Sequence, residues 1–214
     1  MRATTCLASL LTVLAVSVWL ASVAQPQDRS KPIRLFDGRS LDGWEGNLKY
    51  WSVRDGMIVG KHDGIRHNEF LCTRREFEDF ELQLEFRLVG GKGNSGVQFR
   101  SKRVPNSTEV SGYQADIGPG WWGALYDESR RNRLLARPEG TVREQMLKAL
   151  KPDSWNRYVI RAQGNRITLI LNGVRTVEYV ERDRKIRRRG VIGLQIHGGP
   201  PMEIHFRNLV LKEL

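Results

Sequence analysis

Cysteines and long apolar runs are scarce in this sequence. Its 214 residues contain two cysteines, and only Cys72 follows the single long apolar run. A chain with one cysteine after that run has no internal disulfide, so a hydrophobic core has to stabilise the fold. Cys72 lies in the apolar triplet 70–72, with no His or Asp at nucleophile spacing. We therefore expect a small buried residue and not a catalytic thiol.

The one long apolar run lies near the N-terminus. Residues 7–23 are almost all apolar, Arg2 precedes them, and small residues end the run at Ala24. This pattern predicts a signal peptide over residues 1–24, then a polar leader, 25–32, and a single domain, 33–214. A retained membrane anchor is the alternative, but the run lacks a basic stop. No other segment is apolar enough to cross a bilayer, so we expect an exported protein, periplasmic or secreted.

Acidic residues are outnumbered, and the formal net charge is +11. A basic balance raises the question of nucleic-acid binding. The densest basic run, residues 182–189, contains no aromatic side chain on which a base could stack. We therefore expect a solvated loop there and no nucleic-acid partner.

Metal-ligand and phosphate-loop motifs are also missing. His62 and His67 lie five residues apart in a predicted surface loop, which is a weak pattern for a metal site. The glycine-rich stretch 90–96 has neither the Gly-Lys-Ser/Thr ending nor the following helix of a phosphate loop. The sequence requires no cofactor.

Short stretches of alternating apolar and polar residues are abundant. In residues 80–88 every second side chain is apolar, and 97–100, 111–117, 155–162, 166–171, 174–179, 190–197 and 202–211 also read as strands. Asp55-Gly56 and Asn172-Gly173 predict two-residue hairpin turns. Only residues 141–150 have helical spacing. Many short strands with one short helix predict an all-β fold, an antiparallel β-sandwich.

Residues 111–131 form an unusually polar and aromatic stretch. They begin as a strand, turn at 118–120 and continue through a charged segment. The stretch offers Gln114, Asp116, Trp121, Trp122, Tyr126, Glu128 and Arg130. Aromatic faces beside hydrogen-bonding groups suit a sugar ring, which has apolar C–H faces and a rim of hydroxyls. The alternative is a long loop whose tryptophans close the core.

The polar faces of four predicted strands carry a consistent set of side chains. These are Glu85 and Arg87, Gln98 and Arg100, Gln114 and Asp116, and Gln195 and His197. Each pair lies two residues apart, so both members point to the same side of their strand. The set predicts a polar concave surface with a ligand over it.

The order of several short motifs resembles the 3-keto-disaccharide hydrolase domain family. The motifs are Leu35-Phe36-Asp37-Gly38, Leu41-Asp42-Gly43-Trp44, Phe80-Glu81-Leu82, Glu85-Phe86-Arg87, Gly93-Asn94-Ser95-Gly96-Val97, Gly112-Tyr113-Gln114, Trp155-Asn156, Leu171-Asn172-Gly173, Gly193-Leu194-Gln195-Ile196-His197 and Phe206-Arg207-Asn208. The resemblance runs from Leu35 to the C-terminus. It implies a jelly roll of the concanavalin A-like lectin/glucanase type and action on glycosides whose C3 hydroxyl is oxidised to a ketone. Many members have Glu and Gln where this chain has Gln114 and Asp116.

A C3 ketone acidifies the C2 proton, so such a glycoside can lose its aglycone through an enolate, after which water adds. This chemistry needs a base, an acid and groups that stabilise the enolate. From residue type and predicted facing, the base is Asp116 or Glu128 and the acid is His197 or Tyr126. Arg100 and Arg130 would stabilise the enolate, Trp121 and Trp122 would stack on the sugar, and Glu85, Arg87, Gln98, Gln114 and Gln195 would bind substrate.

Four other interpretations stay open. Asp116 and Glu128 could serve an ordinary two-carboxylate glycosidase. A divalent cation at Asp116, Glu128 or His197 could polarise the ketone, but no spacing demands one. The fold also suits a carbohydrate-binding module or lectin without activity. The last interpretation is an envelope protein that binds partners through its basic surface.

Overall fold

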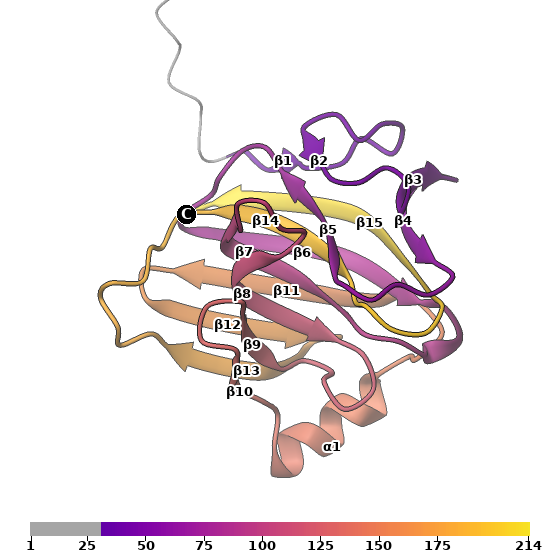
Figure 1. The fold of residues 1–214 in the computed structure, drawn as a ribbon. Coiled ribbons are helices and arrows are strands. Elements are labelled where there is room, and N and C mark those ends of the chain that lie inside the picture. The colour runs from indigo at the N-terminus through magenta and orange to yellow at the C-terminus, as the bar shows by residue number, and fades with distance from the viewer. Residues whose placement is uncertain (1–30) are drawn as a thin grey trace, which may run out of the picture.

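Two antiparallel sheets lie face to face in the computed structural model, which describes residues 31–214 (Figure 1). The predicted signal peptide, 1–24, and the leader up to residue 30 lie outside the described residues. Sheet A has the order β13 (Val174–Val180), β12 (Arg166–Leu171), β11 (Asn156–Gln163), β6 (Phe80–Leu88), β15 (Met202–Glu213), β4 (Met57–His62) and β3 (Trp51–Arg54), with β1 (Ile33–Arg34) on β15. Sheet B has the order β10 (Arg133–Ala136), β9 (Leu125–Glu128), β8 (Val110–Ile117), β7 (Ser95–Arg103), β14 (Val191–Ile196), β5 (Glu69–Thr73) and β2 (Trp44–Glu45). The predicted antiparallel β-sandwich is confirmed.

The core lies between the sheets, and strand β6 shows how alternation builds it. Its odd-numbered residues are half-buried, whereas Phe80, Leu82, Leu84, Phe86 and Leu88 are buried. The rings of Phe80 and Phe99 meet edge to face across the sandwich with centroids 6.3 Å apart. Burying such apolar side chains stabilises the fold by roughly 1.5–3 kcal/mol each.

Turns and helix follow the predictions closely. Asn172 and Gly173 both have positive φ, 49° and 85°, as a two-residue turn between twisted strands requires. Helix α1 (Gly140–Ala149) lies within one residue of the predicted range, and a short 3₁₀ helix, η1 (Val89–Gly91), joins β6 to β7. Within residues 31–214, no helix is long and apolar enough to span a membrane.

The prediction that His62 lies in a surface loop was wrong. Strand β4 extends to His62, and the side chain is 5% exposed. The backbone N–H of Gly64 donates to His62 Nδ1 over 2.9 Å, so Nε2 carries the ring proton and donates to the His197 carbonyl at 3.0 Å. His62 therefore fixes the backbone at His197.

The outer face of sheet B is buried to an unusual degree. Every residue of β8 is buried, and so are the first seven of β7. Cys72 lies on this face with Phe70 and Val110, and burial raises its thiol pKa to about 11, as expected for a small inert residue. The polar side chains that share this face are therefore also largely removed from water.

Candidate active site

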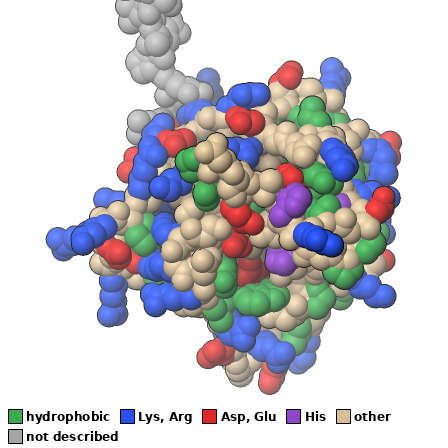
Figure 2. Space-filling model, in the orientation of Figure 1, with side chains coloured by type: hydrophobic (Ala, Val, Ile, Leu, Met, Phe, Trp, Pro, Cys, Tyr) green, Lys and Arg blue, Asp and Glu red, His purple; other side chains and the backbone are tan. Residues whose placement is uncertain are grey.

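An open cavity of about 150 Å³ lies on the outer face of sheet B. Its lining residues are Asn94, Gln114, Asp116, Trp121, Tyr126, Glu128 and His197. They come from β8, β9, the end of β14 and two loops. In Figure 2 the acidic and histidine side chains gather near the centre of this view, whereas Lys and Arg lie mostly around its rim. Six of these seven residues were predicted from the sequence, and Asn94 was not.

Strand register explains why these residues meet. Gln114 on β8 faces Gln98 on β7 and Tyr126 on β9, and directly paired residues point to the same side of a sheet. Gly96 lies opposite Asp116. A Cβ at Gly96 would come within 2.5 Å of Gln114 Cγ, so glycine leaves the space that the Gln114 side chain occupies. The glycine in the Gly93–Gly96 motif thus has a packing role in the site.

A chain of hydrogen bonds leads to Asp116. Ser101 Oγ donates to Gln98 Oε1 at 2.7 Å, Gln98 Nε2 donates to Gln114 Oε1 at 2.9 Å, and Gln114 Nε2 donates to Asp116 Oδ1 at 2.8 Å. All four side chains are buried. The chain fixes the orientation of the carboxyl group and leaves its second oxygen without a partner.

Three buried oxygens have no hydrogen-bond partner; two belong to residues that line the cavity, and the third belongs to Gln195, which bonds the lining residue Glu128. They are Asp116 Oδ2, Asn94 Oδ1 and Gln195 Oε1. An unpaired buried acceptor costs about 1–3 kcal/mol, and such groups are rare in folded proteins. The hydroxyl groups of a sugar can donate to these oxygens or, where the carboxyl group is protonated, accept from Asp116 Oδ2. Asn94 was not among the predicted site residues, because its glycine-rich motif indicates only a turn.

Burial sets the ionisation of the two carboxyl groups. Burial raises the pKa of Asp116 to about 8, with the Gln114 hydrogen bond opposing and the Glu128 charge adding to the shift. The pKa of Glu128 is also raised, by burial and then by Glu109, while His197 lowers it. At neutral pH Asp116 therefore holds its proton, and the two carboxyl groups can take opposite roles.

The other cavity groups are hydrogen-bond partners or a stacking surface. His197 Nδ1 lies 2.6 Å from the Gly198 carbonyl, which only accepts, so Nδ1 carries a proton and Nε2 is the ring nitrogen left for a ligand. Burial and neighbouring carboxylates raise the pKa of Tyr126, so its hydroxyl stays protonated. The Trp121 ring meets Tyr126 edge to face at 5.8 Å.

Metal binding has few candidate ligands here. Asp116, Glu128 and His197 are the side chains of the cavity that could hold a cation, together with the Asn94 oxygen. In the part of the chain that the structure describes, no group of three or more His, Cys, Asp or Glu side chains is placed to bind one ion.

Glu85 and Arg87 do not share this face, contrary to expectation. Both lie on β6 in sheet A, whose polar side faces away from sheet B. Glu85 accepts from Arg207 Nε at 2.7 Å, and Arg87 pairs with Asp153. Alternation assigns a side chain to a face of its own strand, but it does not tell which of the two sheets the strand joins.

Arg100 also points away from the cavity. Its backbone has φ 48° next to an irregularity in the β7–β8 pairing, which turns the side chain. The guanidinium group is 1% exposed and binds Asp79 at 2.7 Å and the carbonyls of Glu78 and Gly164. Arg100 therefore ties strand ends together, and the expectation that it faces the site was wrong.

Arg130 is likewise outside the cavity. Its Nε binds Asp127 Oδ1 at 2.8 Å, and its guanidinium lies 4.3 Å from the Tyr113 ring centroid. Tyr113 and Asp127 lie on the side of sheet B opposite Gln114 and Tyr126, because neighbours along a strand alternate.

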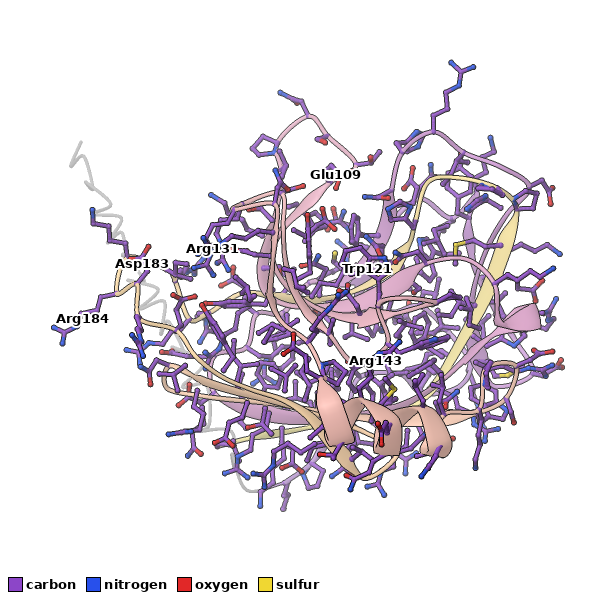
Figure 3. All side chains as sticks on the ribbon, turned by 90° about the horizontal axis from the view of Figure 1, so that it is seen from below. Glu109, Trp121, Arg131, Arg143, Asp183 and Arg184 are labelled. Carbon is purple, nitrogen blue, oxygen red and sulfur yellow. The ribbon has the colours of Figure 1, made fainter. Side chains whose placement is uncertain are left out.

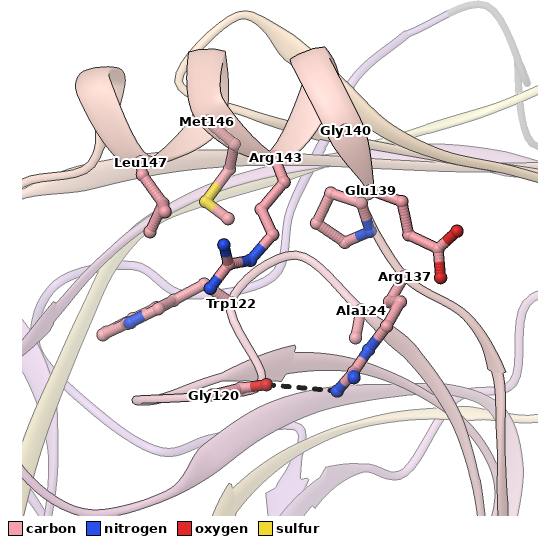
Figure 4. A pocket seen from close by; sticks show the side chains of 10 residues that line it. Gly120, Trp122, Ala124, Arg137, Glu139, Gly140, Arg143, Met146 and Leu147 are labelled. Atoms are coloured by element: carbon pink, nitrogen blue, oxygen red, sulfur yellow. Dashed lines mark hydrogen bonds between the residues drawn. The ribbon is translucent and has the colours of Figure 1, made fainter.

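The two tryptophans separate at the turn between β8 and β9. Trp121 lines the candidate site, but Trp122 is buried and stacks on Phe86, with ring centroids 6.3 Å apart. Trp122 also lines a different cavity beneath α1, together with Met146 (Figure 4). Of the two predicted stacking surfaces, only Trp121 lies in the site. Trp122 closes the core instead.

Comparison with known proteins gives consistent matches. Residues 31–212 match the family described as "3-keto-alpha-glucoside-1,2-lyase-like domain". A 3-keto-disaccharide hydrolase of Bacteroides thetaiotaomicron is 32% identical over 95 residues, which cover 39% of this chain and 32% of that protein. The match thus spans about a third of that relative's length.

Solved structures share the fold at lower identity. A protein provisionally assigned as a glycosyl hydrolase from Parabacteroides distasonis is 19% identical, with a TM-score of 0.65 over 89% of this chain and 98% of its own. The carbohydrate-binding module CBM66 of Bacillus subtilis is 15% identical, with a TM-score of 0.56 over 80% of this chain and 96% of its own. The family match covers most of the chain. This chain belongs to the 3-keto-alpha-glucoside-1,2-lyase-like domain family.

Proposed function

We propose that this protein cleaves the glycosidic bond of 3-keto-glycosides by acid–base chemistry in the cavity on sheet B. The observation that carries the proposal is the pairing of a buried, protonated Asp116 with the more accessible Glu128. Three buried oxygens without a partner, in the cavity lining or next to it, support it, because sugar hydroxyls can pair with such groups. The family match and the name of the B. thetaiotaomicron relative indicate the 3-keto substrate class.

The reaction begins at C2 of the oxidised sugar. A base removes the C2 proton, and the electron pair of that bond forms the enolate on the C3 oxygen. The enolate then expels the aglycone from C1, forming a C1–C2 double bond, and the departing oxygen takes a proton from an acid. Addition of water across that double bond would complete a hydrolysis, and without it the protein acts as a lyase.

The cavity groups suit these steps with base and acid roles that differ from those of the sequence-based hypothesis. Glu128 is the proposed base, with the free Nε2 of His197 beside it as the alternative. Asp116 is the proposed acid, because it carries a proton at neutral pH. Tyr126 would donate a hydrogen bond to the enolate oxygen, a role that Arg100 and Arg130 cannot fill from their positions.

Substrate discrimination tests the proposal directly. The purified protein is incubated with a 3-keto-disaccharide and with its unoxidised parent, each with and without a chelator. We expect sugar release from the keto form alone. Release from both substrates would indicate an ordinary two-carboxylate glycosidase, and loss of activity with the chelator would assign a metal to the reaction.

A carbohydrate-binding module is the second candidate, because the fold matches CBM66. A module of that kind would bind both sugars without releasing product from either. Its affinity would depend on Trp121 and not on Asp116 or Glu128.

Trp121→Ala is expected to raise KM about tenfold with little change in the free energy of unfolding. Trp121 is half-exposed beside the cavity, so the substitution removes a stacking face worth about 1.4 kcal/mol, which corresponds to tenfold, and no core packing. Trp155→Ala is the control, because Trp155 packs on Arg207 and lies outside the cavity. An unchanged KM in Trp121→Ala would show that the sugar does not lie on this ring.

Export of the mature domain is also part of this proposal. It stands on the apolar run and small residues at 7–24. N-terminal sequencing of protein recovered from outside the cytoplasm would test it, with Gln25 expected as the first residue.

A further inference from the structure

A second cavity, of about 250 Å³, lies beyond Gln98 along strands β7 and β8. Its lining residues are Arg100, Ser101, Lys102, Ser111, Arg130, Lys185, Ile186, Arg187 and Arg189. Six of these nine are Lys or Arg, and none is Asp or Glu. The basic loop 182–189 forms one wall, and Figure 3 shows its Asp183 and Arg184 projecting from one side of the domain, away from Trp121. We name this cavity the basic pocket.

The carboxylates next to the basic pocket balance only part of its charge. Asp79 forms an ion pair with Arg100, and Glu76 alone forms ion pairs with both Arg187 and Arg189. Among the described residues, the ammonium groups of Lys102 and Lys185 have no ion-pair partner. Positive charge thus exceeds negative charge here, and a low-dielectric wall strengthens its field.

Arg130 presents an unused donor in this pocket. Asp127 binds Arg130 Nε but also binds Arg131, so two guanidinium groups share one carboxylate. Arg130 Nη2 is buried and has no acceptor. The ring of Tyr113 holds the plane of the guanidinium. A fixed, partly desolvated guanidinium with a free N–H is the group that proteins use to bind oxyanions.

We propose that the basic pocket binds a tetrahedral oxyanion, a sulfate or phosphate group. Arg130 Nη2 would donate to it, the Ser111 hydroxyl would add a neutral donor, and Lys102 and Lys185 would supply charge from the rim. The anion would satisfy the buried donor and offset the excess positive charge. This inference does not depend on the proposed enzymatic activity.

Anion titration with matched variants tests the inference. Binding of sulfate and of phosphate is measured by calorimetry at constant ionic strength set with chloride. The double variant Lys102→Gln, Lys185→Gln is compared with Lys148→Gln, Lys151→Gln, which makes the same charge change at exposed sites elsewhere. We expect the first pair to weaken sulfate binding about tenfold and the second to change it less than about twofold. Equal weakening by both pairs would overturn the proposal, because it would show only general attraction to a basic protein.

A resonance of the Arg130 side chain provides a second readout that needs no substitution. In NMR spectra of the wild-type protein, the Arg130 Nε–H signal should shift in a saturable way with sulfate and not with chloride. A signal that stays in place would also overturn the proposal. Competition by dextran sulfate for the bound sulfate would identify an ester group on a polymer as the source, whereas competition by free phosphate alone would identify a free anion. Displacement by duplex DNA with the salt dependence of phosphate contacts, and not by dextran sulfate, would assign the pocket to nucleic acid instead.

Discussion

Glu128→Gln is expected to lower kcat on a 3-keto-glycoside by about 10²–10⁴-fold, the range that a positioned general base contributes. The substitution keeps the size of the side chain and an oxygen that can accept the Gln195 hydrogen bond, which spans 3.5 Å. It replaces the basic carboxylate with an amide, whose oxygen is too weakly basic to take the C2 proton. KM should change little, since binding groups elsewhere in the cavity remain. Steady-state kinetics on the keto substrate provide the measurement.

Substrates with different leaving groups distinguish the general base from the general acid. Asp116→Asn should slow release of a sugar aglycone strongly and release of a nitrophenol aglycone only weakly, because nitrophenolate departs without a proton. Glu128→Gln should slow both substrates alike, since C2 deprotonation precedes departure in each. If Glu128→Gln retains turnover on both, Glu128 is not the base, and the free Nε2 of His197 becomes the candidate.

Glu109→Gln is the matched control for Glu128. Glu109 lies near Glu128 and raises its pKa, but it does not line the cavity. The control should retain turnover and move the acidic limb of the kcat/KM profile to lower pH, because a base with a lower pKa is ionised at lower pH. An unmoved acidic limb would show that another group controls it.

Alternation predicts much of this fold because it acts within one strand. The apolar face of residues 80–88 and the polar face that carries Gln114 and Asp116 were both predicted correctly from period two. Turns at Asn172-Gly173 followed from the positive φ that such residues accept. These properties depend only on residues close together in the chain, so they can be predicted from short stretches of sequence.

The assembly of the site is a nonlocal property, and there the sequence was insufficient. Glu85 and Gln114 look equivalent in their strands, but β6 and β8 belong to different sheets. Arg100 has the spacing of a site residue, yet a local irregularity turns it to bind Asp79. The raised pKa of Asp116 depends on burial by the surrounding fold, so the sequence could not separate acid from base.

Asp116→Asn is expected to gain stability against unfolding, relative to the wild type, as the pH rises from 5 to 8, even though it impairs catalysis. In the folded protein the pKa of Asp116 is about 8, whereas an unfolded Asp has a pKa of about 3.9. The folded state therefore binds the proton more tightly, and the stability that this proton contributes is full below about pH 4 and is lost as pH rises to about 8. Asn is neutral at every pH and has no such loss.

The quantity to measure is the difference in unfolding free energy between Asp116→Asn and the wild type, from urea titrations at pH 5, 6, 7 and 8. We expect this difference to increase in favour of the variant by up to about 1.4 kcal/mol per pH unit, since other titrating groups cancel. Asp153→Asn, which removes an exposed carboxylate in the turn before β11, should show a difference that stays nearly constant. A constant difference for Asp116→Asn as well would mean that Asp116 is ionised in the folded protein at pH 5. In that case Asp116 could not be the acid, and the base and acid roles of Asp116 and Glu128 would have to be exchanged.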